Sequence, residues 1–94
     1  MTLRELRSKA VQRMESDVIR LEKDLANMKS THGQLQQSLF DTVKNLQDAP
    51  DSARMLREAE DLKRHISELV VSMHHLDARI SRLRHRARRL GSTG

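Results

Sequence analysis

Five histidines are the side chains of this chain best suited to binding a metal ion or exchanging a proton near neutral pH. His74 and His75 are adjacent, so on a helix their side chains point about 100° apart and cannot share a simple site. His65 has only carboxylates a turn away, and His85 lies among arginines. Because no second histidine or cysteine stands at ligand spacing, we expect neither a metal site nor a cofactor.

The carboxylates form no pair suited to acid–base catalysis. Glu58, Glu60 and Asp61 are close in sequence, but arginines and lysines surround them, which is typical of a solvated, salt-bridged surface. The sequence has no glycine-rich phosphate loop and no serine, histidine and aspartate arranged for nucleophilic attack. Without cysteine it has neither disulfides nor a thiolate metal site. We therefore expect a protein that is not an enzyme, with an intracellular location, cytoplasmic or nuclear.

The distribution of charge is the strongest functional signal in the sequence. Residues 79–94 carry six arginines and no acidic residue, and residues 1–14 carry four basic residues against one acid. The intervening residues 15–78 have a net charge of −4, which brings the whole chain to +5. We predict a basic pole that binds a partner through Arg4, Arg7, Arg13, Arg79, Arg82, Arg84, Arg86, Arg88 and Arg89.

The elements that must position these residues follow from a heptad pattern. Apolar residues recur at alternating steps of three and four, the spacing of coiled-coil helices, and aromatic residues are almost absent. In the first half this seam comprises Val11, Met14, Val18, Leu21, Leu25, Met28, His32, Leu35, Leu39, Thr42 and Leu46. In the second half it comprises Met55, Ala59, Leu62, Ile66, Leu69, Met73, Leu76, Ile80, Leu83, Ala87 and Leu90. The pattern predicts an all-α protein, one helical-hairpin domain over residues 1–94, with helices over about 2–47 and 52–90.

Local signals predict the outer ends of the two helices. Thr2 followed by Glu5 has the pattern of a capping box at the first N-terminus. Gly91 is expected to end the second helix in a left-handed conformation, followed by a short tail over residues 91–94.

The turn between the helices is marked by the only proline of the sequence. Residues 48–51 interrupt the heptad pattern, and we expect Asp48, or alternatively Asp51, to cap the second helix with Pro50 in its first turn. A second candidate break lies at residues 30–33. The heptad phase continues through it, which favours one continuous helix, straight or bent.

Two helices of similar length joined by a short connection are expected to fold back as an antiparallel hairpin. If the turn is centred on Pro50, the facing seam pairs include Leu35 and Ile66, Leu25 and Leu76, Leu21 and Ile80, and Val18 and Leu83. The flanking ion pairs predicted from this register join Asp17 and Asp24 to Arg79 and Arg86, and Glu15 to Arg84. The rival architecture is one continuous helix in a parallel dimer, and an interior proline disfavours it. In the hairpin, both basic segments lie at the same end.

His32 is the unusual member of the seam, where it should face Leu69. One interpretation is a pH-sensitive layer, since protonation would place a charge in the seam. The plainer interpretation is a polar seam residue that fixes the register of the helices, as an occasional buried asparagine does in coiled coils. We favour the plainer one.

A two-helix hairpin buries each helix along one narrow stripe, so a further apolar contact is expected. Outside the seam, apolar or small residues recur at seven-residue steps in the first helix, and more stand beside the seam of the second. The predicted self-association face comprises Ile19, Ala26, Gly33, Phe40, Leu56, Val70 and Val71. It would serve a homodimeric four-helix bundle or a partner helix. The alternative is scattered apolar surface residues, which are common.

These patterns favour a non-enzymatic coiled-coil interaction or assembly module, a scaffold or adaptor, whose basic pole binds an acidic protein. One alternative is a nucleic-acid-associated protein that binds phosphate without sequence specificity. Another is a small helical chaperone or adaptor that holds the amphipathic helix of another protein. A membrane surface is disfavoured because the apolar residues near the pole belong to the seam, and no apolar run could span a membrane. A basic surface that only maintains solubility is the plainest alternative.

Overall fold

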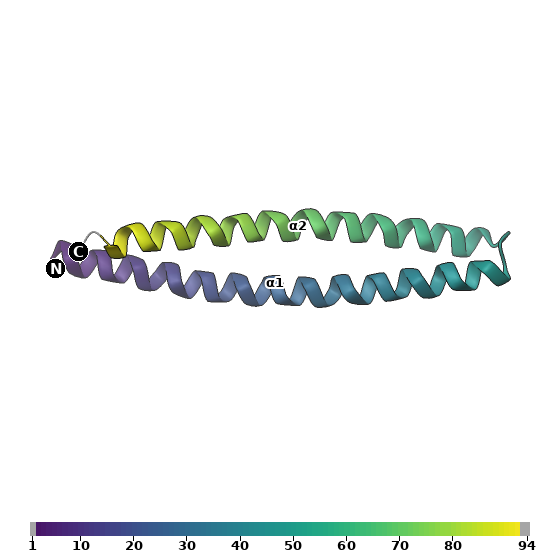
Figure 1. Ribbon diagram of the computed structural model, residues 1–94, viewed down its shortest axis with the longest axis horizontal. Helices are drawn as coiled ribbons and strands as arrows, with labels where there is room; N and C mark the ends of the chain where they lie inside the picture. Colours follow the sequence, from purple (N-terminus) through teal and green to yellow (C-terminus); the bar gives the residue numbers. More distant parts are fainter. Residues whose placement is uncertain (1, 93–94) are drawn as a thin grey trace. The chain divides into compact units, whose positions relative to one another are not determined.

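Two long helices account for almost all of the structure. The computed structural model describes residues 2–92, in which α1 spans Leu3–Asp48 and α2 spans Ala53–Ser92 (Figure 1). The helices pack in the antiparallel sense, so the all-α hairpin predicted from the heptad pattern is confirmed. Their bounds lie within two residues of the predicted ones.

The residues group into two compact units, each of which contains part of both helices. Unit 1 comprises Met1–Ala26 and His74–Gly94, and unit 2 comprises Asn27–Met73. Unit 2 therefore contains the turn, and unit 1 combines the beginning of α1 with the end of α2. This pairing of sequence-distant segments is what an antiparallel hairpin requires. The single domain over residues 1–94 stays a prediction.

The core of unit 1 forms where seam residues of the two helices meet. Ile80 of α2 is 2% exposed and clusters with Val18 and Leu21 of α1. The half-buried residues packed against this cluster are Leu25, Leu76 and Leu83. The cluster unites residues that a turn centred on Pro50 places opposite one another, in agreement with the predicted register. Burial of the apolar side chains along this seam is the main source of stability in the unit.

Unit 2 contains a smaller and more polar buried layer. Ala59 of α2 and Thr42 of α1 are both buried, and the Thr42 hydroxyl donates a hydrogen bond to the Ser38 carbonyl oxygen at 2.9 Å. The hydroxyl is therefore satisfied within its own helix. His32 is half-buried, as its seam position predicts. In both units every residue of the predicted seam is buried or half-buried.

Helix α1 continues without interruption through residues 30–33, so the prediction of one continuous helix is confirmed. The Thr31 hydroxyl donates a hydrogen bond to the Asn27 carbonyl oxygen at 3.1 Å, which provides the local polar group with a partner inside the helix. Gly33 is exposed, and a methyl group added there would meet no atom within 4 Å.

The cap of α2 differs from the prediction. The Met55 amide donates a hydrogen bond to the Ser52 hydroxyl oxygen at 3.3 Å, so Ser52 is the N-cap, whereas Asp48 is the last residue of α1. The Ser52 amide donates to the Ala49 carbonyl oxygen at 3.1 Å and closes a tight turn. Pro50 is the second residue of this turn, the position that suits its fixed φ. The prediction that Pro50 lies in the first turn of α2 was therefore wrong.

The outer helix ends agree with the prediction at one terminus only. The Glu5 amide donates to the Thr2 hydroxyl and the Thr2 amide donates to the Glu5 carboxylate, both at 3.2 Å, which confirms the capping box. At the other terminus α2 continues through Gly91 to Ser92, and no glycine within residues 2–92 has a positive φ. The predicted left-handed stop at Gly91 was wrong because glycine permits that conformation without requiring it. Residues 93–94 of the predicted tail lie outside the described residues.

Candidate functional site

The basic pole predicted from the sequence belongs to unit 1. This unit carries twelve basic and six acidic residues, a net charge of +6, whereas unit 2 carries six basic and seven acidic residues, a net charge of −1. All nine arginines of the predicted pole lie in unit 1. The fold therefore joins two basic segments from opposite ends of the sequence into one strongly basic unit.

The heptad positions place the arginines of α2 on two edges of the helix, on either side of the seam. We define edge A as Arg79, Arg82, Arg86 and Arg89, which alternate at steps of three and four. We define edge B as Arg84 and Arg88, which are four residues apart. All six side chains are exposed.

Edge B lies against acidic residues of α1. The Arg84 guanidinium donates a hydrogen bond to the Glu22 carboxylate, and this ion pair connects the two helices. Glu15, Ile19 and Arg88 are among the residues that line a groove of about 1140 Å³ on the same edge. The positive charge of edge B is therefore partly neutralised within the molecule.

The partner of Arg84 differs from the prediction, which assigned Glu15. Side chains on a helix tilt toward the N-terminus of their own helix. Arg84 therefore tilts toward Ile80, which clusters with Leu21, the neighbour of Glu22 in sequence. Glu15 tilts toward the N-terminus of α1, away from Arg84. The predicted pair was wrong because residues directly opposite one another in sequence register have side chains that tilt apart.

Three arginines of edge A have no ion-pair partner in the described part of the chain. Arg79, Arg82 and Arg86 form no ion pair with any residue between 2 and 92. Positive charge that has no acidic partner in the same molecule is available to a ligand.

The two aspartates expected to neutralise edge A do not do so. Asp17 forms an ion pair with Arg20 of its own helix at 3.6 Å, and Asp24 has no ion-pair partner in the described chain. The predicted pairs to Arg79 and Arg86 were wrong. An aspartate side chain is short, and Asp17 finds a basic residue one turn away on α1, where such pairs form readily.

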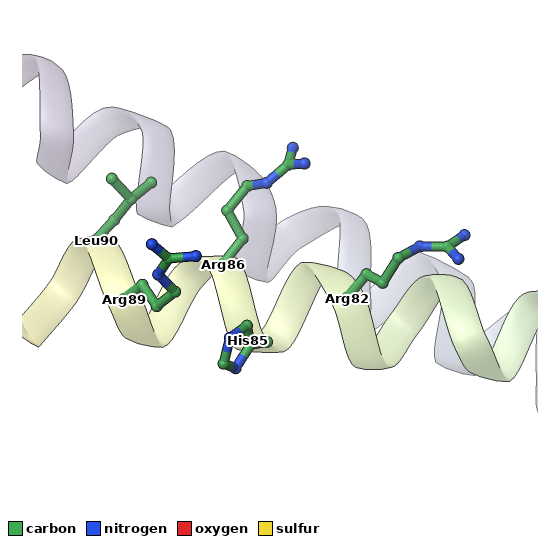
Figure 2. Close-up of a pocket in the computed structure, with 5 residues that line it drawn as sticks. All are labelled: Arg82, His85, Arg86, Arg89 and Leu90. Carbon is green, nitrogen blue, oxygen red and sulfur yellow. The ribbon is translucent and has the colours of Figure 1, made fainter.

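Figure 2 shows the surface at the C-terminal part of edge A. Arg82, His85, Arg86, Arg89 and Leu90 line a pocket of about 460 Å³. Arg86 and Leu90 extend from α2 on the side that faces α1, whereas His85 points away from α1. A neighbouring pocket of about 340 Å³ is lined by Arg79, Arg82, Leu83 and Arg86. Each pocket combines guanidinium groups with one leucine of the seam, so the surface presents both charge and apolar area.

The N-terminal arginines of the predicted pole occupy different environments. Arg4 and Arg13 are exposed, and Arg7 is half-buried. Arg4 and Arg7 line a pocket of about 370 Å³ that also includes Leu90 of α2. This pocket places the beginning of α1 beside the end of α2 and extends the basic surface of unit 1.

The residues of the predicted self-association face divide between the units. In unit 1 Ile19 is 69% exposed and Ala26 is exposed. In unit 2 the exposed members are Gly33, Phe40, Leu56 and Val71, whereas Val70 is half-buried beside the seam. Val43, which was not predicted as part of this face, is 44% exposed and follows Phe40 by three residues. The three-residue step, which places two side chains on one helix face, was the signal that could have identified it.

Two further observations concern the described residues as a whole. Within residues 2–92 no three histidine, cysteine, aspartate or glutamate side chains gather where they could hold a metal ion. Neither described helix combines the length and apolar character needed to cross a membrane.

The chain matches no protein-family model, no curated protein and no solved structure.

Proposed function

We propose that this protein is a coiled-coil interaction module, a scaffold or adaptor, whose basic pole binds an acidic protein partner. The observation that supports it best is the exposure of Arg79, Arg82 and Arg86 without an ion-pair partner among residues 2–92. Guanidinium groups bind carboxylates in a bidentate geometry, and they lose less hydration than lysine does on binding. A surface that only maintains solubility is better served by interspersed charges of both signs.

Removing four charges of the pole should strongly weaken binding of the acidic partner. We expect the combined replacement of Arg84, Arg86, Arg88 and Arg89 by glutamine to weaken binding by about 2 kcal/mol, or roughly thirtyfold, through the loss of exposed positive charges. The measurement is capture of the partner from an extract of the source cell, followed by titration of the purified partner with the wild type and the variant.

A matched variant removes four charges from unit 2 instead, by replacing Arg54, Arg57, Lys63 and Arg64 with glutamine. It lowers the net charge by the same amount and should retain binding. Far-ultraviolet circular dichroism should show unchanged helicity in both variants, since all eight positions are exposed. Equal weakening by the two variants would indicate a response to net charge alone and would contradict a specific role for the pole.

We also propose that the protein self-associates through exposed apolar residues. In unit 1 the residue is Ile19, and in unit 2 it is Phe40, which shares a helix face with Val43. Exposed apolar side chains that share a helix face offer a contact surface, and a hairpin with one narrow seam gains stability from a second contact.

Aspartate at these positions should separate the two copies. We expect Phe40→Asp and Ile19→Asp, made separately, each to shift the mass in analytical ultracentrifugation from that of a dimer toward that of a monomer, because a buried unpaired charge opposes association. Gln34→Asp at an exposed position of α1 is the control and should leave the mass unchanged. A wild-type protein that sediments as a monomer at all concentrations would refute self-association.

A further inference from the structure

We infer that Arg79, Arg82 and Arg86 of edge A are the binding site for an acidic helix of the partner. The inference rests on the proposed function and adds two features to it. The first feature is that the partner binds at one edge of the pole, edge A. The second is that the acidic segment of the partner is a helix whose carboxylates recur at steps of three and four residues.

The choice of edge A follows from the ion pairs of unit 1. On edge B, Arg84 already binds the Glu22 carboxylate, and Glu15 lines the same groove as Arg88. A ligand at Arg84 must therefore compete with the Glu22 carboxylate. On edge A, Arg79, Arg82 and Arg86 have no ion-pair partner between residues 2 and 92, so a ligand that binds them breaks no existing ion pair.

The helical form of the ligand follows from the spacing of Arg79, Arg82 and Arg86 along α2. On an α-helix, steps of three and four residues correspond to about 4.5 Å and about 6 Å along the axis. Carboxylates at steps of three and four on a second helix have the same axial spacing, so three charge pairs can form at once without bending either chain. The two pockets on edge A also include Leu83 and Leu90. A ligand with apolar as well as acidic residues, such as an amphipathic helix, therefore fits this surface best.

Two other occupants fit this edge less well. The heptad register places Arg13 and Arg20 of α1, together with Asp17 and Asp24, beside edge A, so a second copy docked edge to edge would present charges of both signs and not a continuous acidic row. Single-stranded nucleic acid is bound largely by stacking bases on aromatic side chains, and unit 1 contains no aromatic residue. Duplex phosphate remains the competing ligand, and the experiment includes it.

The experiment uses two fluorescent synthetic peptides of identical composition. In the row peptide, glutamates repeat at steps of three and four along one face of a helix with leucines beside them. In the isomer, the same glutamates are distributed around the helix. Fluorescence anisotropy at low salt measures binding to the full-length protein. We expect the row peptide to bind about tenfold more tightly than the isomer, because only its charges reach all three arginines together.

Two charge-matched variants then test the assignment to edge A. R82Q/R86Q should weaken binding of the row peptide about tenfold, whereas R84Q/R88Q, which removes two arginines from edge B, should weaken it by about twofold or less. R82K/R86K keeps the positive charge and should retain part of the affinity, with the remainder lost because lysine cannot form the bidentate contact. Circular dichroism verifies the helicity of each variant.

Each outcome separates this inference from the proposed function. Equal weakening by R82Q/R86Q and R84Q/R88Q would overturn the assignment to edge A, while the proposed role of the pole would stand. Equal affinity for the row peptide and the isomer would overturn the helical form of the ligand. Binding of random duplex DNA in place of both peptides would overturn the inference in favour of phosphate. The proposed function itself fails if the cellular partner binds the fourfold glutamine variant of the pole as tightly as the wild type, or if the matched variant of unit 2 weakens binding equally.

Discussion

Replacing Ile80 by alanine should lower the free energy of unfolding by about 3 kcal/mol, the largest loss expected from any alanine substitution in the described chain. Ile80 is 2% exposed and is the most deeply buried large side chain among residues 2–92. It packs against Val18 and Leu21 of the opposite helix, so its truncation removes apolar burial and leaves a space at the contact between α1 and α2. Single domains are commonly stable by about 5–15 kcal/mol, so this one change removes a large fraction of the total.

Urea denaturation followed by circular dichroism is the appropriate measurement, at one fixed protein concentration because self-association would make the midpoint depend on concentration. Leu6→Ala is the control. Leu6 is also a large aliphatic residue of unit 1, but it is 53% exposed, so its truncation should change the free energy by less than about 0.5 kcal/mol. Similar losses for the two variants would show that Ile80 and Leu6 are equally buried in solution and would contradict the register of unit 1.

The seam that makes Ile80 important could be predicted from the sequence. Burial in a two-helix hairpin depends mainly on the direction in which each position points, and that direction follows from the helical period. The heptad pattern therefore identified all of the buried and half-buried apolar positions from Val11 to Leu46 and from Met55 to Leu90, apart from Val70. It also placed His32 and Thr42 correctly in the seam although both are polar.

The turn could not be predicted to the same accuracy, because several short-range signals competed there. Asp48, Asp51 and Ser52 are all good N-cap residues, and Pro50 is accepted both in the first turn of a helix and in the second position of a tight turn. The structure selects Ser52, whose hydroxyl reaches the Met55 amide. A cap depends on a single hydrogen bond, whereas the seam repeats over many residues, and repetition is what made the seam predictable.

In the candidate site, too, the overall charge could be predicted from the sequence, whereas the individual ion pairs could not. The concentration of arginines in unit 1 could be predicted, because it requires only the antiparallel fold. The neutralised arginine could not be identified, because an ion pair depends on where a long side chain ends rather than where its helix position lies. Arg84 binds Glu22 and not Glu15. The side chains of Arg84 and Glu22 each tilt toward the N-terminus of their own helix, and because the helices are antiparallel the two side chains converge. The distinction between edges A and B therefore required the structure.

Substitutions at Gly33 should change stability in opposite directions. Gly33 lies inside α1, is exposed, and has no atom within 4 Å of where a methyl group would stand. Gly33→Ala should raise the free energy of unfolding by about 1 kcal/mol, because alanine restricts the unfolded chain and favours the helix without altering any contact. Gly33→Pro should lower it by about 3 kcal/mol or more, since proline removes a helical hydrogen bond and clashes with the preceding turn.

The two variants together test the continuity of α1 through residues 30–33, where four consecutive residues with weak helix propensity made a break conceivable. If the helix were interrupted there in solution, proline would be tolerated and alanine would bring no gain, so the span of about 4 kcal/mol between the variants would collapse. Urea denaturation of both proteins measures that span. Sedimentation of Gly33→Ala tests self-association at the same position. If a helix from another copy packs closely on Gly33, the added methyl group displaces it. The dimer would then weaken while the hairpin itself became more stable.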